Sequence, residues 1–229
     1  DAAAKILGDS VTLSASTGIG TASALDVNVN TVTSATSATG GIALNLLGDA
    51  VAANNLAADH AVTVTAADAS TSGAITLTAT SGSGTKTYTS VDTNDGNISL
   101  TATQGAIVLG TIASDTGVAG ANDITVTATA GAITVNTSVT SDDTVSLTAN
   151  TTINDNAADD VADVLGSAVT LSAQTGIGTT SSFDVDVVTV TSATTVTGGI
   201  ALNLLDADNG GVTVTAADAS TSGAITLTA

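Results

Sequence analysis

The chain contains the same string of eighteen residues twice, VTVTAADASTSGAITLTA, at Val62–Ala79 and at Val212–Ala229. A longer stretch recurs as well, because Asp1–Leu47 returns as Asp159–Leu205 with most positions identical. Self-similarity at a fixed spacing is typical of proteins that stack one structural unit along an axis. We therefore predict one continuous domain over residues 1–229. Its repeat unit of about 150 residues covers 1–158, and a second, partial copy covers 159–229.

Short runs in which apolar and polar residues alternate recur along the whole chain. One type resembles VTVTA, as at Val62–Ala66, and the other resembles GAITL, as at Gly73–Leu77. Strict alternation is the pattern of a strand with one buried and one wet face. Many rungs thus consist of a VTVTA-type strand, a turn and a GAITL-type strand. The sequence predicts an all-β parallel solenoid of about nine rungs, with interior ladders formed by residues such as Val62, Val64, Ile75 and Leu77.

The composition favours a narrow interior. Apolar residues make up 43% of the chain, almost all of them Val, Ile, Leu and Ala, and the only aromatic residues are Tyr88 and Phe183. Small branched side chains suit a thin solenoid better than a large globular core. The absence of cysteine excludes a disulfide framework. No apolar run approaches the roughly 20 residues of a membrane helix, so no membrane insertion is predicted.

The charge is strongly negative. Lys5 and Lys86 are the only strong cations against 21 acids, which gives a net charge of −19, and every acid is Asp. Asp suits tight turns, so we expect these acids at corners between strands. Such an acidic surface argues against nucleic acid and anionic membranes as partners. Two stretches stand outside the strand pattern: Ala50–His60, where a helical turn is expected, and Asn154–Val164, where a loop or short helix is expected.

Several short motifs carry a family resemblance, and they occur in the same order in both copies: Thr17–Thr21, Leu25–Val29 and Thr39–Asn45, then Thr175–Thr179, Phe183–Val187 and Thr197–Asn203. This pattern resembles the repeat regions of filamentous-haemagglutinin-like giant exoproteins and adhesins of bacteria. The resemblance implies a right-handed parallel β-helix that is secreted and displayed at the cell surface. It carries over no catalytic residue.

Two acidic motifs are candidates for calcium binding. Asp92–Gly96 and Asp206–Gly210 share a D-x-[ND]-[ND]-G pattern. An EF-hand loop needs a later Glu, and this chain has none. We interpret both motifs as turns between strands. The sequence therefore predicts no cofactor and no specific metal site, although weak calcium binding on so acidic a surface is expected.

Pairs of Thr separated by one residue are a second candidate site: Thr63/Thr65, Thr76/Thr78, Thr87/Thr89, Thr101/Thr103, Thr189/Thr191 and Thr213/Thr215. Stacked on one flat face, they could order water as ice-binding solenoids do. Thr is also the natural outward residue of a strand, and its side chains can form ladders between rungs. Because the pairs occur on more than one strand type, the sequence favours this structural role.

Nothing in the sequence predicts an enzyme. His60 is the only imidazole, is absent from the second copy, and is expected to be solvated in a loop. The remaining candidates are interpreted as turn residues: the glycine pairs Gly18/Gly20 and Gly176/Gly178, and the acid pairs Asp142/Asp143 and Asp159/Asp160. Lys86 and Tyr88 are expected to be a distinctive feature of the surface. We predict no catalytic, cofactor-binding or metal-binding residue.

The predicted function is structural. We expect a secreted, cell-surface repeat protein that acts as a stalk, fibre or adhesive filament, with self-association as its main interaction and cell-surface or matrix ligands as further partners. Two alternatives stay open. A surface-layer protein would assemble into a lattice with calcium, and an ice-binding solenoid would carry a flat face of Thr in register.

Overall fold

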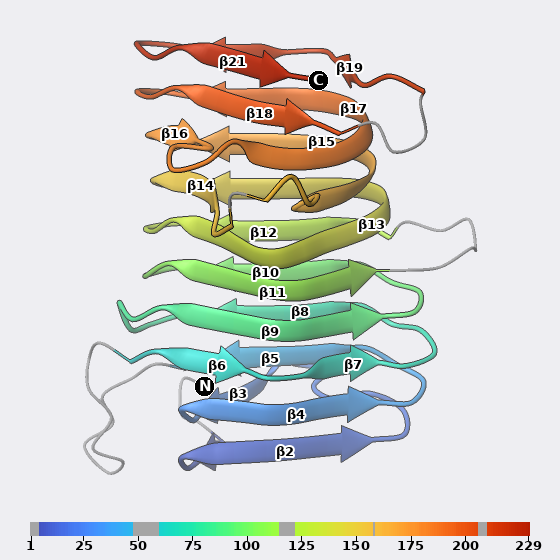
Figure 1. Cartoon of the computed structure of the whole chain (residues 1–229). Helices are drawn as coiled ribbons and strands as arrows, with labels where there is room; N and C mark the ends of the chain where they lie inside the picture. The colour runs from blue at the N-terminus through green and yellow to red at the C-terminus, as the bar shows by residue number, and fades with distance from the viewer. Residues whose placement is uncertain (1–4, 48–59, 115–121, 158, 206–209) are drawn as a thin grey trace.

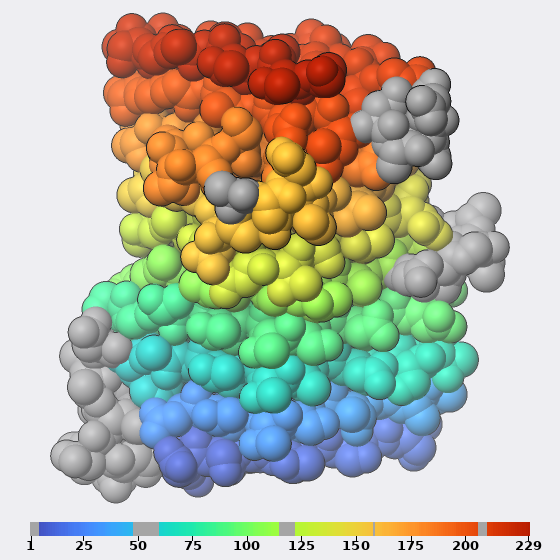
Figure 2. Space-filling view, viewed as in Figure 1, coloured from blue at the N-terminus to red at the C-terminus, as the bar shows by residue number. Residues whose placement is uncertain are grey.

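The chain forms a parallel β-solenoid in the computed structural model, with rungs stacked in order from the N-terminus to the C-terminus (Figure 1). The structure describes residues 5–47, 60–114, 122–157, 159–205 and 210–229. Within these ranges the strands pair in parallel, and there is no helix. The space-filling view shows the rungs as successive bands along one rod (Figure 2). The predicted all-β solenoid is confirmed.

Two layers of strands enclose the core. We name each layer after one of its inward residues. The Lys86 face contains β2 (Ser10–Ala15), β4 (Thr31–Ser37), β6 (Val62–Val64), β7 (Ala67–Ala69), β9 (Lys86–Thr93), β11 (Ile107–Ser114), β14 (Thr152–Asp155), β16 (Gly176–Ile177), β18 (Ile200–Leu204) and β21 (Ile225–Thr228). The Ile75 face contains β1 (Ile6–Leu7), β3 (Leu25–Asn28), β5 (Ile42–Leu46), β8 (Ile75–Ala79), β10 (Ile98–Ala102), β12 (Ile124–Ala128), β19 (Thr213–Val214) and β20 (Ala217–Ala219). Three longer strands pass from the first face to the second: β13 (Ile133–Ala149), β15 (Val164–Ala173) and β17 (Phe183–Thr195).

Each face is held in register by ladders of aligned residues. One ladder on the Ile75 face has nine members, Ile19, Ile42, Ile75, Ile98, Ile124, Val145, Val169, Val190 and Val214. Nine members enclose eight complete rungs, which is close to the number expected. Its counterpart on the Lys86 face is Val62, Lys86, Ile107, Ile133, Ile153, Ile177, Ile200 and Ile225.

The alternation seen in the sequence explains why these ladders face inward. Residues i and i+2 of a strand point to the same side, so the apolar members of each run all enter the core. Val62, Val64, Ile75 and Leu77 are each at most 2% exposed, as predicted. Neighbouring rungs lie about 4.8 Å apart, so stacked aliphatic side chains exclude water along the whole axis.

The sequence repeat and the rung repeat do not coincide. Six steps of one ladder lead from Ile75 to Val214, and Ile225 follows half a rung later on the other face. The sequence equivalents Ile75 and Ile225 are therefore separated by six and a half rungs. As a result, strands with identical sequences lie on opposite faces of the rod: β8 is on the Ile75 face and β21 on the Lys86 face.

The two stretches without strand alternation have different outcomes. Most of the first, the predicted helical turn at Ala50–His60, lies outside the described residues. In the second, β14 ends at Asp155 and β15 begins at Val164, and the described residues between them form a loop, as expected. Among the described residues no helix is long and apolar enough to cross a bilayer.

Candidate functional site

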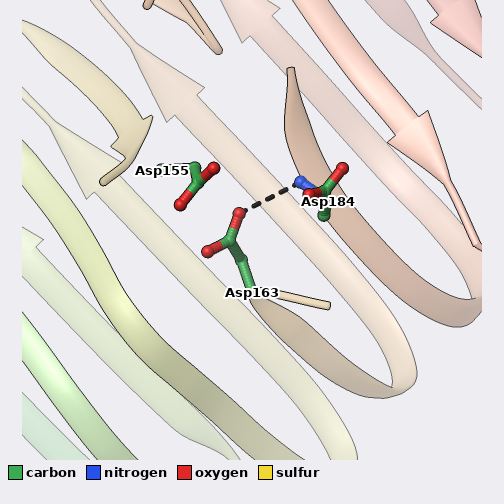
Figure 3. Close-up of side chains that lie close together, drawn as sticks. All are labelled: Asp155, Asp163 and Asp184. Atoms are coloured by element: carbon green, nitrogen blue, oxygen red, sulfur yellow. Dashed lines mark hydrogen bonds between the residues drawn. The ribbon is translucent and has the colours of Figure 1, made fainter. Parts of the chain in front are cut away.

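Three Asp side chains converge inside the rod near the junction of the two copies. Asp155 ends β14, Asp163 immediately precedes β15, and Asp184 is the second residue of β17. One carboxylate oxygen of each lies within 4.8 Å of the others, and all three residues are buried, with 3–6% of their surface exposed. Figure 3 shows the side chains pointing toward one another from three separate strand ends. Within the described ranges this is the group of acids that could hold a metal ion.

An interruption in a ladder of the Lys86 face creates the space for this carboxyl cluster. The ladder runs from Val64 through Tyr88, Leu109 and Val135 to Asp155. Above it, β14 pairs with β16 only at two residues, so Asp155 has no strand partner on that side. The side chains of the neighbouring loop and of Asp184 fill this position instead.

Hydrogen bonds fix the carboxyl groups in place. The Asp184 amide donates to Oδ2 of Asp163 over 3.0 Å. Asp155 accepts from the amide of Ala157 at 2.7 Å and from the hydroxyl of Ser181 at 3.1 Å. The carboxyl groups of Asp155 and Asp163 are therefore partly satisfied by the protein, although all three carry like charge when ionised.

Burial changes the protonation of the cluster. The pKa of Asp163 is raised to about 8, mainly by loss of water and in smaller part by the nearby carboxylates of Asp155 and Asp184, while the hydrogen bond from the Asp184 amide lowers it. Burial also raises the pKa of Asp184, against a hydrogen bond from Asn203. With a pKa of about 8, the Asp163 carboxyl group is largely protonated at neutral pH.

The cluster can be neutralised in two ways. Protons can be shared between the carboxyl groups, as in other sites where like charges lie close together. Alternatively, a hard cation such as Ca²⁺ or Mg²⁺ can take the carboxylate oxygens as ligands, because these ions prefer oxygen donors. The residues that would hold it are Asp155, Asp163 and Asp184. The cluster consists of three carboxyl groups, so its oxygens can bind a cation or hold protons.

The prediction for Lys86 and Tyr88 is wrong, because both are fully buried. They occupy inward positions of β9, in phase with the apolar ladder. The Lys86 ammonium donates to the carbonyl oxygens of His60, Gly82 and Gly84 at 3.1, 2.7 and 2.5 Å. These carbonyls replace the water that a surface lysine would bind. Removal from water raises the pKa of Tyr88 above its usual value.

The prediction that His60 is solvated is also wrong. Its side chain is 5% exposed, and its Nε2 lies 2.7 Å from Oδ1 of Asn30. Burial, and secondarily the positive charge of Lys86, lower its pKa. The neutral imidazole is thus a packed part of the rod, close to the Lys86 ammonium.

The other predicted residues are dispersed. Asp92 points outward on β9, Thr93 ends that strand, and the last three residues of the Asp92–Gly96 motif form a bend before β10. Residues 206–209 of the matching motif lie outside the described residues. Asp142 and Asp143 fall at a register shift within β13 rather than in a turn. Asp159 forms the expected turn, where its Oδ1 accepts the Val161 amide at 3.0 Å. Gly20 and Gly178 both have φ of +65° at a corner, in agreement with the prediction, whereas Gly176 begins strand β16 and is not a turn residue.

Sequence reasoning missed the carboxyl cluster. Two of its residues have direct equivalents in the first copy: Asp184 corresponds to Asp26, and Asp163 corresponds to Lys5. This reversal of charge between otherwise similar segments was the available signal. Comparison with known proteins adds no relative: no family model, no curated protein and no solved structure matches the chain.

Proposed function

We propose that this chain is a structural rod that serves as a stalk, fibre or filament at a bacterial cell surface. The observation that supports this most strongly is the ladder of nine aligned residues from Ile19 to Val214. Backbone hydrogen bonds between rungs lie along the rod axis, so an axial pull is shared by many bonds at once. Such a structure transmits force and sets a distance.

The eighteen-residue string supports growth of the rod by stacking. In the first copy, Ile98 and Leu100 of the next rung cover Ile75 and Leu77 of this string. Ile75 and Leu77 are therefore 0% exposed. In the second copy, Ile225 and Leu227 are each 43% exposed. A sheet edge with apolar side chains favours pairing with another strand. In this proposal the next rung provides that strand, either from a continuation of the chain or from a second copy, and head-to-tail contacts between copies produce filaments.

The cell-surface location and an adhesive role rest on the resemblance to filamentous-haemagglutinin-like exoproteins. The net charge of −19 is compatible with a long rod of this kind, because mutual repulsion keeps such rods soluble and opposes their lateral aggregation. Ligands on other cells or in the matrix would contact the exposed side chains of the rod.

Electron microscopy of the purified chain, with calcium and with a chelator, tests the proposal. We expect rods that lengthen with concentration and diffract at about 4.8 Å along the axis. Replacing Ile225 and Leu227 by Asp should block lengthening, whereas Thr226→Asp on the same strand should not. Sheets that dissolve in chelator would indicate a surface-layer lattice instead. Single short particles under all conditions would overturn self-assembly.

A further inference from the structure

The outer surface of the Ile75 face carries two columns of aligned hydroxyl groups, with one register shift where β15 pairs with β17. Across six consecutive rungs every outward residue in both columns is Thr or Ser. The first column is Thr76, Ser99, Thr125, Ser146, Thr170 and Ser192, and the second is Thr78, Thr101, Thr127, Thr148, Ser172 and Thr194. The two columns lie about 6.6–6.8 Å apart, and successive members of a column about 4.8 Å apart.

The Lys86 face follows the same strand alternation without this uniformity. One of its outward columns is Thr63, Thr87, Val108, Thr134 and Asn154, and another is Asp68, Asp92, Ala113, Thr140, Leu165 and Asp186. Val108 and Asn154 interrupt the first column, and charged and apolar residues interrupt the second. The regular hydroxyl grid is therefore a property of one face and not a general result of a Thr-rich composition.

The half-rung offset of the repeat extends this grid. Its first rungs come from β8, β10 and β12, and its last two come from β15 and β17. The first-copy equivalents of these last two strands, β2 and β4, lie on the Lys86 face. Strands of unlike sequence and from both copies thus contribute hydroxyl groups to one surface.

The hydroxyl groups of the grid are available to a ligand. None of the twelve hydrogen-bonds another protein group within the described ranges, in contrast to Thr39, Thr103 and Thr197, whose hydroxyls donate to carbonyls of the preceding rung. The Thr and Ser residues of the grid are thus stacked as ladders between rungs, as the sequence suggested, without hydrogen bonds between their hydroxyls in the described ranges. Each hydroxyl can donate one and accept two hydrogen bonds, and each Thr adds a methyl group beside it.

We propose that the hydroxyl grid of the Ile75 face binds ice. The grid is periodic in two directions and uncharged, although the chain carries 21 Asp residues. Ice presents hydrogen-bonding oxygens that repeat in two directions at distances close to those of the grid. Crystalline polysaccharide is also periodic, but sugar rings are bound by exposed aromatic faces, and both aromatic residues of this chain, Tyr88 and Phe183, are fully buried. Many weak water contacts repeated over six rungs add up to a stable attachment.

Ice-affinity partitioning and thermal hysteresis of the whole chain test this proposal. The wild type should enter growing ice and produce hysteresis, while serum albumin does neither. Thr127→Tyr at the centre of the grid should abolish both signals, since a bulky ring disrupts the lattice contact. The matched control is Thr134→Tyr, an outward and half-buried position on the Lys86 face, which should retain them.

Folding of each variant is checked by its thermal melting curve, and Thr148→Tyr, an exposed position one rung further, replaces Thr127→Tyr if the latter does not fold. A wild type that partitions no better than albumin would overturn the proposal. Equal loss of ice partitioning and hysteresis in Thr127→Tyr and Thr134→Tyr would also overturn it. Adsorption to cellulose or chitin powder without adsorption to ice would assign the grid to a polysaccharide instead.

Discussion

The eighteen residues at Val62–Ala79 and their identical copy at Val212–Ala229 form the same strands in different surroundings. In the first copy Leu77 packs between Leu44 and Leu100 and is fully buried. In the second copy Leu227 packs on Leu202 alone and is 43% exposed. Local sequence therefore determines the strands and turns, whereas the neighbouring rung determines how much apolar surface is buried. Most of the stability of a solenoid lies in these contacts between rungs.

A second difference between the copies concerns charge. The amide of Lys5 donates to the carbonyl of Asp26 at 2.9 Å, and the amide of Asp163 donates to that of Asp184 at the same distance. The backbone is thus equivalent, but the first copy places a cation where the second copy places a buried acid. The carboxyl cluster arises from this single exchange together with Asp155.

The largest expected difference between the copies is the cost of truncating the same leucine. Leu77→Ala should lower the free energy of unfolding by about 2–5 kcal/mol, because a buried side chain leaves a cavity. Leu227→Ala should lower it by less than about 1 kcal/mol, as for other exposed positions. Chemical denaturation of both variants measures the difference. Equal losses would show that the end of the rod is buried in solution.

Glycine at a corner should show the opposite behaviour, with equal effects in the two copies. Gly20 and Gly178 both have φ of +65°, and an added Cβ would collide with the carbonyl oxygen of Ala43 or Ala201. Each Gly→Ala variant should therefore cost about 1–3 kcal/mol, measured by the same denaturation experiment. Gly210→Ala is the control, because no atom lies within 4 Å of its added Cβ. Unequal losses at Gly20 and Gly178 would contradict the equivalence of the two corners.

A third expected difference between the copies is in the pH dependence of stability. The pKa of Asp163 is about 8 in the folded protein, well above that of an unfolded Asp, so the folded state holds a proton that the unfolded chain releases. The stability of the fold should therefore fall as the pH rises from about 4 to about 8. Asp163→Asn should remove this fall and raise the melting temperature at pH 8.

Asp26→Asn, in the equivalent region of the first copy, provides the control and should leave the pH dependence in place. A wild-type melting temperature that does not change between pH 5 and pH 9 would contradict the assignment. If added Ca²⁺ raises the melting temperature at pH 8 in the wild type and not in Asp163→Asn, the cluster is neutralised by a cation as well as by protons.

The fold was predictable from the sequence because strand alternation and the internal repeat both indicate stacked parallel strands. The same alternation places Lys86 and Tyr88 inward and Thr87 outward. The prediction for this pair failed because it assumed that a charged residue must be exposed. The phase between the copies was not predictable, since the number of residues per rung varies: Ile124 to Val145 is 21 residues and Ile42 to Ile75 is 33. Burial of Asp184 was also not predictable, because three consecutive residues, Phe183 to Val185, are buried and break the alternation.

The six and a half rungs between equivalent residues determine how many partners the rod can engage. The Asp68–Gly73 segment and its identical partner, Asp218–Gly223, point to opposite sides and lie about 31 Å apart along the axis. A single antibody specificity raised against this segment would therefore find two epitopes facing away from each other. Rods of this kind are bivalent by construction, so one type of bridging molecule could link them side by side into an extended network.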